Sequence, residues 1–136
     1  MRYWESVLRL VDAAGSFAFK EKLLENLRDK NTSFKVEPVV EKYYGGSEVL
    51  LSRRIYDAQK WFNDCVMELN LECEKNSLRG VAAPTRLLHL LYSKDRRGYY
   101  KREAKKLLAK NEVISLQDLE ERFTRYRQRQ KERGNN

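Results

Sequence analysis

The sequence lacks a long apolar stretch. Charged residues make up 35% of its 136 residues, and no apolar run approaches the ~18 residues that a membrane span requires. The N-terminal sequence MRYWESVLRLV is interrupted by Glu5 and Arg9, and no small-residue cleavage site follows it, so we expect no signal peptide. These absences favour a globular cytoplasmic protein that makes no contact with a membrane.

Metal-binding and nucleophilic residues are also scarce. The two cysteines, Cys65 and Cys73, form no CxxC motif, and the one histidine, His89, lies inside the apolar sequence LLHLL. A metal site needs roughly three or four ligands, so we expect no metal or other cofactor, and we expect the cysteines to be reduced. The chain has no Walker A, GxGxxG or GxSxG motif. We therefore predict that the protein is not an enzyme.

Helical periodicity is abundant. Apolar residues recur every three or four positions in the longer segments. Signs of strands are weak, because the alternating sequence FKVEPVV is interrupted by Pro38. The length fits one domain. The sequence predicts an all-α fold, with residues 1–136 forming a single-domain helical bundle of about six or seven helices.

Turn and capping residues predict the helix ends in the first half. Gly15 is expected to end the first helix, and Ser16 to cap a second one that runs to residue 30. A short helix is expected at residues 36–44. Ser47 is expected to cap the longest and central helix, residues 48–72, whose apolar stripe includes Phe62.

The second half has three expected helices. Pro84 begins a short and nearly all-apolar helix, which we expect to be buried on most sides. A basic helix follows at about residues 95–110. Ser115 and Asp118 resemble a capping box at the start of the final helix.

The net charge of +8 is concentrated in the last third of the chain. Residues 1–93 hold 14 Lys and Arg against 13 Asp and Glu, a net charge of +1, whereas residues 94–136 hold 14 against 7, a net charge of +7. A basic segment joined to a neutral one suggests a polyanionic partner. The basic C-terminal helices, from about residue 94, are therefore the candidate binding region.

Within this region, the sequence YSKDRRGYYKREAKKLLAK contains eight basic residues and three tyrosines. On a helix its basic residues form columns at i, i+4 spacing, which destabilises an isolated helix. The final helix repeats the pattern with arginines, whose planar guanidinium suits phosphate oxygens. The candidate nucleic-acid-binding residues are Arg96, Arg97, Lys101, Arg102, Lys105, Lys106, Arg122, Arg125 and Arg129.

Several features of this region have two interpretations. The basic faces either bind phosphate or are merely solvated. The three tyrosines, Tyr92, Tyr99 and Tyr100, either stack on bases or lie at the edge of the core. Gly98 is either a break between two helices, which we favour, or a point of close backbone approach. A helix-turn-helix is a weaker alternative, because the exposed face of its second helix has no Asn, Gln, Ser or Thr for base edges.

The chain shows a resemblance of architecture to a known family. The resemblance rests on the long apolar stripe in LLSRRIYDAQKWFNDCVMEL and on two basic sequences, DRRGYYKREAKKLLAK and RFTRYRQRQKER. The chain resembles the small helical subunits of CRISPR RNA-guided effector complexes. The resemblance implies a non-catalytic, RNA- or DNA-binding subunit of a larger ribonucleoprotein assembly in antiviral defence. Its partners would be nucleic acid and other protein subunits, including copies of itself.

Our main expectation is sequence-independent binding to a nucleic-acid backbone through basic helix faces. One alternative is a protein–protein interaction adaptor that binds an acidic partner. Another is a helix-turn-helix DNA-binding regulator.

Overall fold

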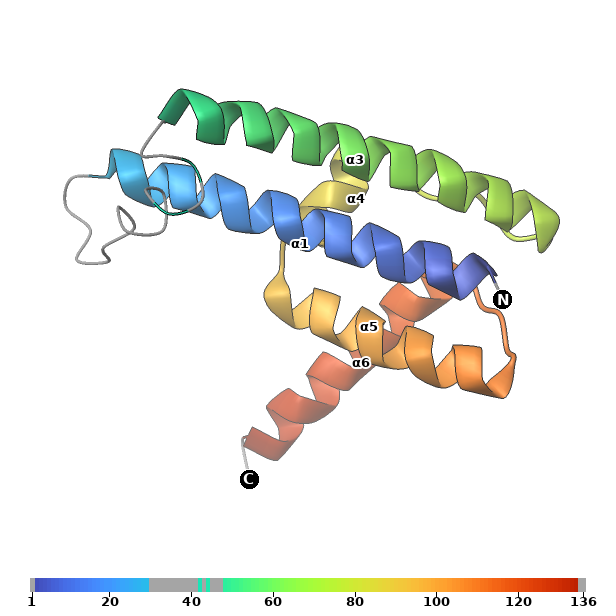
Figure 1. Ribbon diagram of the computed structural model, residues 1–136. Helices are drawn as coiled ribbons and strands as arrows, with labels where there is room; N and C mark the ends of the chain where they lie inside the picture. Colours follow the sequence, from blue (N-terminus) through green and yellow to red (C-terminus); the bar gives the residue numbers. More distant parts are fainter. Residues whose placement is uncertain (1, 30–41, 43, 45–47, 135–136) are drawn as a thin grey trace.

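The protein is all-α. The computed structural model describes residues 2–29, 42, 44 and 48–134, and helix is the only regular secondary structure among them. Figure 1 shows the helices: α1 (Arg2–Arg28), α3 (Glu48–Lys75), α4 (Pro84–Leu90), α5 (Lys94–Lys110) and α6 (Leu116–Gly134). The predicted fold class is confirmed, but six or seven helices is too many for the described part of the chain. None of the helices described is long and apolar enough to cross a membrane.

The predicted break at Gly15 is wrong, because α1 runs through Gly15 and Ser16 without interruption. The apolar pattern continues beyond them, and Phe17, Ala18 and Leu23 are buried. One glycine inside a helix costs about 1 kcal/mol relative to alanine, which is less than the gain from burying a side chain such as Phe17. Tertiary packing therefore outweighs the local signal.

The expected helix at residues 36–44 and the expected cap at Ser47 lie almost entirely outside the described residues. Lys42 and Tyr44 are described, and both are helical. Tyr44 is buried in a small apolar cluster with Leu23 and Leu51.

Helices α1 and α3 form an antiparallel pair (Figure 1). Two ion pairs join them at opposite ends, Arg9 with Glu68 and Arg28 with Glu48. The predicted stripe of α3 faces α1, and Phe62 at its centre is completely buried. The helix extends to Lys75, a few residues beyond the expected end.

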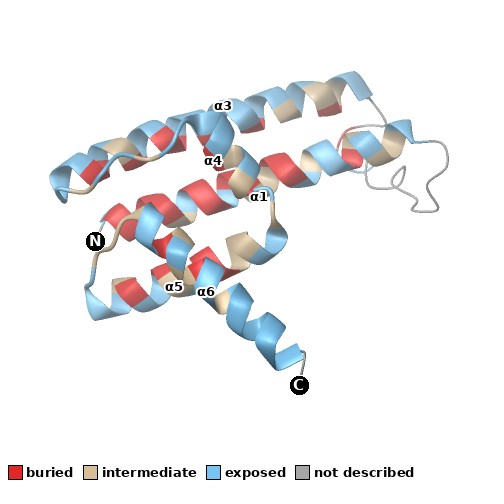
Figure 2. Ribbon diagram, turned by 180° about the vertical axis from the view of Figure 1, so that it is seen from behind, coloured by how far each residue is buried: buried red, intermediate tan, exposed pale blue. Residues whose placement is uncertain are grey.

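On the other side of α1 lies α5, and α6 crosses α5 (Figure 1). One apolar cluster includes residues from all five helices. The Trp4 indole N–H donates a hydrogen bond to the backbone oxygen of Glu112, which ties the start of α1 to the turn between α5 and α6. Figure 2 shows that buried residues lie where the helices face one another, while the last part of α6 is exposed.

The prediction for α4 is wrong in one respect. Within α4 only Leu87 is buried, and His89 is exposed. A helix of seven residues that packs on its neighbours through one side leaves its other apolar residues partly in solvent.

Helix α5 is continuous through Gly98, so the favoured break there is also wrong. Ser93 caps its start by accepting a hydrogen bond from the Arg96 backbone N–H at 3.3 Å, and Asn111 ends it in the left-handed conformation, φ 56°. The predicted cap of α6 is confirmed, since Ser115 Oγ accepts from the Asp118 N–H at 3.1 Å.

Candidate nucleic-acid interface

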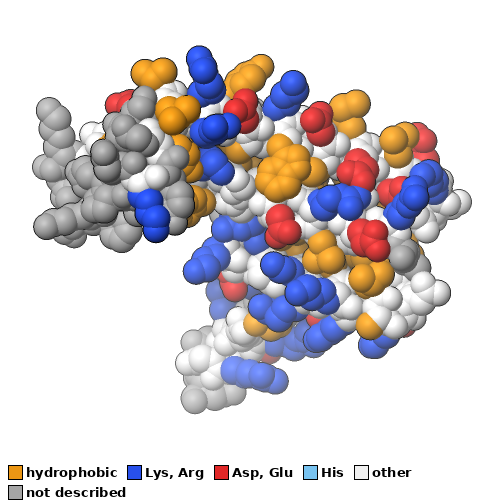
Figure 3. All heavy atoms as spheres, in the orientation of Figure 1, with side chains coloured by type: hydrophobic (Ala, Val, Ile, Leu, Met, Phe, Trp, Pro, Cys, Tyr) orange, Lys and Arg blue, Asp and Glu red, His pale blue; other side chains and the backbone are white. Residues whose placement is uncertain are grey.

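The outer side of α5 carries the basic residues of the candidate site. Tyr100, Ala104 and Leu107 are buried, and this directs the side chains at the intervening positions to solvent. Four of those side chains are exposed: Lys101, Arg102, Lys105 and Lys106. Figure 3 shows Lys and Arg side chains gathered over α5, whereas the surface of α3 mixes both signs of charge.

The crossing of α5 and α6 brings their basic residues together. The Glu103 carboxylate of α5 lies 3.4 Å from Lys106 Nζ and 3.9 Å from Arg122 of α6. Burial and the Glu103 charge raise the pKa of Tyr99, while Arg122, Arg129 and Arg125 act to lower it. The positive charges of all three arginines of α6 therefore act on this tyrosine of α5. We use the name α5–α6 basic face for Arg102, Lys105, Lys106, Arg122, Arg125 and Arg129.

Arg96 has a structural position. Its guanidinium lies 3.0 Å from a carboxylate oxygen of Glu120 and 4.8 Å from the centre of the Phe123 ring. It also donates a hydrogen bond to the backbone oxygen of Leu90 at 3.0 Å. The Tyr100 hydroxyl donates to the other oxygen of Glu120. With a side chain that is only 18% exposed, Arg96 joins α4, α5 and α6 and has little surface left for a ligand.

Arg97 is engaged in a similar way. One of its terminal nitrogens donates to the backbone oxygens of Leu91 at 2.9 Å and Tyr92 at 2.7 Å, just beyond the end of α4. Desolvation by burial lowers the pKa of Arg97. A Cβ atom at Gly15 would lie 3.3 Å from Arg97 Nε, so Gly15 marks the point where this side chain packs on α1. Arg97, Lys101 and Lys105 follow one another at i, i+4 spacing, and this column thus begins with a residue that points into the structure.

Lys101 lies at the edge of the site. Its ammonium nitrogen is 3.7 Å from an Asp12 carboxylate oxygen of α1, and both side chains are about half exposed. A solvent-exposed pair of this kind contributes little to stability, and phosphate can replace the carboxylate. Lys101 therefore remains available at the border with α1.

The tyrosines divide into two groups. Tyr99 and Tyr100 are buried, with Tyr99 packed against Tyr126 at a ring distance of 4.9 Å. Tyr92 is 39% exposed, but it lines a groove with Phe19 and other residues of α1 rather than the α5–α6 basic face. Of the three tyrosines considered for base stacking, two are core residues and the third is elsewhere.

Two basic residues that are not among the predicted binding residues lie near one of them, Arg96. Arg127 and Lys131 line a hollow of about 530 Å³ on α6, together with Arg96 and Phe123. The Arg127 guanidinium lies 5.8 Å from the centre of the Phe123 ring. The sequence does contain a signal for this contact, because Arg127 follows Phe123 at i, i+4 spacing. The sequence does not show which side of α6 remains exposed to solvent, because that depends on how α6 crosses α5.

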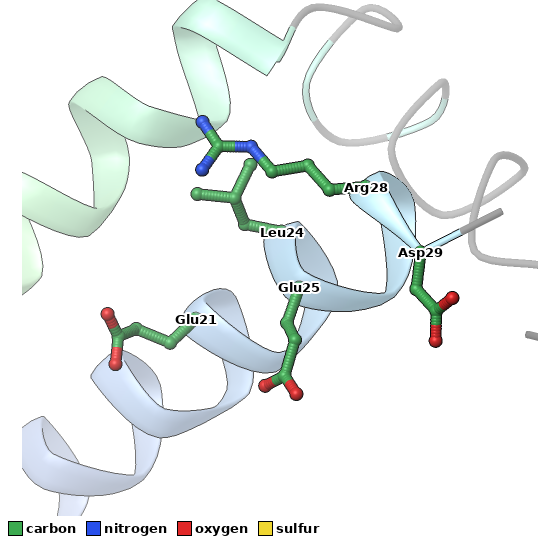
Figure 4. A pocket seen from close by; sticks show the side chains of 5 residues that line it. All are labelled: Glu21, Leu24, Glu25, Arg28 and Asp29. Carbon is green, nitrogen blue, oxygen red and sulfur yellow. The ribbon is translucent and has the colours of Figure 1, made fainter.

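The end of α1 carries the opposite charge. A hollow of about 450 Å³ there is lined by Glu21, Leu24, Glu25, Arg28 and Asp29. Figure 4 shows the carboxylates of Glu21, Glu25 and Asp29 on one side of the helix, while Arg28 extends toward α3, where it pairs with Glu48 at 2.6 Å. Three carboxylates repel phosphate, so this hollow is no part of the basic site.

The described residues contain no group of three or more His, Cys, Asp or Glu side chains that could hold a metal ion. Both cysteines are buried and free, and burial, followed by nearby carboxylates, raises the pKa of each thiol. That shift keeps the thiols protonated at neutral pH.

Comparisons of this chain with protein-family models, with curated proteins and with solved structures find no match.

Proposed function

We propose that this protein is a non-catalytic subunit of a larger ribonucleoprotein assembly, and that it binds the backbone of nucleic acid through the α5–α6 basic face. The observation that carries the proposal is the convergence of two basic helices. The α5–α6 basic face has six Lys and Arg side chains on two packed helices, and Glu103 is the only described carboxylate that forms ion pairs with any of them.

The composition of the face favours phosphate as its ligand. Like charges on adjacent helical turns oppose helix formation, so the energy of folding alone gives no reason to concentrate them. Lys and Arg carry the positive charge, and arginine pairs with phosphate oxygens through two parallel hydrogen bonds. Backbone contacts of this kind hold nucleic acid without selecting a sequence.

The resemblance to the small helical subunits of CRISPR effector complexes supports the wider setting of the proposal. In such an assembly the protein would hold RNA or DNA beside other subunits, in the cytoplasm.

Salt-dependent binding tests the proposal. Binding to single- and double-stranded RNA and DNA of unrelated sequences is measured by gel shift at several salt concentrations. The variant Arg102→Ala/Lys106→Ala/Arg125→Ala removes three exposed charges from the face. Each phosphate contact contributes roughly 0.7–0.9 to the steepness of the decrease of log affinity with log salt concentration. Losing three contacts should therefore reduce the magnitude of this slope by roughly 2–3.

The matched control is Lys22→Ala/Arg79→Ala/Arg86→Ala, which removes three exposed charges elsewhere. It should weaken binding slightly through the overall field and leave the slope almost unchanged. Circular dichroism checks that both variants fold. Equal slopes for wild type and the face variant would refute the proposal. Binding only to an acidic protein would favour the adaptor, and strong preference for one duplex would favour the regulator.

A further inference from the structure

Helix α3 has an apolar stripe on its outer side as well as on its inner side. Val49, Tyr56, Met67 and Leu71 are 75%, 69%, 67% and 58% exposed. Their spacing places them on the side of α3 opposite to Leu51, Phe62 and Leu69, which are buried against α1. Figure 3 shows apolar side chains along α3 interspersed with charged ones. Exposed aromatic and aliphatic residues in a row are typical of an interaction surface.

Charged residues complete this surface and are ordered by sign. We use the name outer stripe for the eight exposed residues Val49, Arg53, Tyr56, Lys60, Asp64, Met67, Leu71 and Glu74. The first half holds two positive charges, Arg53 and Lys60, and the second half holds two negative charges, Asp64 and Glu74. None of these four side chains forms an ion pair with another described residue. The stripe is therefore complementary to a copy of itself that runs in the opposite direction.

We propose that two copies of this protein associate through the outer stripe, with their α3 helices antiparallel about a twofold axis at the level of Phe62. In this arrangement Lys60 of each copy faces Asp64 of the second copy. Tyr56 packs on Met67 of the second copy, a favourable contact between an aromatic ring and sulfur. The aliphatic part of Arg53 covers Leu71. A twofold contact of this kind uses the same surface on both chains and closes at two copies.

The charges favour the antiparallel direction and disfavour the two neighbouring registers. A parallel pair would place Lys60 against Lys60 and Asp64 against Asp64. An antiparallel pair shifted by one position along the stripe would bring either the two Lys60 or the two Asp64 side chains together at the axis. Like charges at an interface oppose association. Of these arrangements, only the register centred near Phe62 brings opposite charges together in both copies.

The proposed contact is independent of the nucleic-acid proposal. Helices α3 and α5 lie on opposite sides of α1 (Figure 1), so the dimer leaves both basic faces open. A single helix from each chain gives a small interface, and small interfaces are typical of weak complexes. We therefore expect a dimer that forms as the protein concentration rises.

Charge reversal at two positions tests the contact, with the oligomeric state measured by sedimentation equilibrium over a range of concentrations. Lys60→Glu places a new carboxylate against Asp64 of the second copy, and Asp64→Lys places a new ammonium group against Lys60 of the second copy. Each repulsive contact occurs twice in the dimer, so each single variant should weaken dimerisation by about tenfold or more. The control Lys110→Glu makes the same change in charge as Lys60→Glu at an exposed site on α5 and should leave dimerisation unchanged.

Two combinations make the test specific. An equimolar mixture of the two single variants should form a heterodimer, because both cross-contacts then join opposite charges. The double variant Lys60→Glu/Asp64→Lys should again form a homodimer. If the mixture associates but the double variant does not, Lys60 does not face Asp64 of the second copy and the proposed arrangement is wrong. A wild-type protein that stays monomeric, or a dimer that the single variants do not weaken, would overturn the proposal.

Discussion

Arginine residues in the same basic segment lie in two different environments, one engaged internally and one exposed. Arg96 and Arg97 follow each other in the sequence and donate hydrogen bonds to the backbone around the end of α4. Cationic side chains are favourable there because the last carbonyl groups of a helix lack partners within it. Arg102, five residues after Arg97 on α5, is exposed. Residue type alone does not distinguish a phosphate ligand from a side chain that caps a helix.

Replacing Arg96 tests this distinction at a single residue. Arg96→Ala removes the partner of a Glu120 carboxylate that is only 28% exposed, together with the contact to the Phe123 ring. We expect the free energy of unfolding to fall by about 1–3 kcal/mol, the usual range for losing hydrogen bonds to a charged group. The control Lys105→Ala should change it by less than about 0.5 kcal/mol, because Lys105 is exposed. Urea denaturation measures both, and equal effects would contradict the structural role of Arg96.

At the scale of the helix, the two glycines did not end helices, although glycine is unfavourable in a helix interior. Both Gly15 and Gly98 were expected to interrupt helices, and both lie within continuous ones. At Gly15 the missing side chain leaves room for Arg97. At Gly98 there is no comparable neighbour, because an added Cβ would meet only the flexible end of Arg102 at 3.4 Å. The two glycines therefore differ in how much a substitution should cost.

The substitution Gly98→Ala should stabilise the protein. Alanine favours a helix interior by roughly 0.5–1 kcal/mol over glycine, and its methyl group fits without a clash. Chemical denaturation should show a gain of that size. Gly134→Ala, at the end of α6 with nothing within 4 Å, is the control and should have almost no effect. A loss of stability in Gly98→Ala would show that α5 needs a flexible backbone at this point.

In the whole molecule, the apolar core and the positively charged end of α6 lie in different places. The apolar cluster is shared by all five helices, whereas residues 127–134 of α6 are all exposed. The end of α6 therefore contributes positive charge to the surface but no buried side chain to the core. Under the proposed function, binding and folding depend on different parts of this helix.

A shortened chain that ends at Gln128 tests this separation. It lacks Arg129, Lys131 and Arg133 but keeps the buried Leu119 and Phe123. The free energy of unfolding should change by less than about 0.5 kcal/mol. If Arg129 contacts phosphate, the salt slope of nucleic-acid binding should fall by roughly 0.7–0.9. Denaturation and gel shifts on the same sample measure the two effects, and a large loss of stability would place the tail in the core.

The sequence by itself determined the helical class, the buried stripe of α3, the cap of α6 and the position of the excess positive charge. These properties depend on residues close together in the chain, through the helical period, local hydrogen bonds and composition. Only the tertiary structure decided that α1 and α5 continue through their glycines, and that Arg96 and Arg97 are engaged internally. It also brought Arg122, Arg125 and Arg129 to α5. Those outcomes depend on how α1, α5 and α6 pack, and packing contacts between distant segments leave no periodic signal in the sequence.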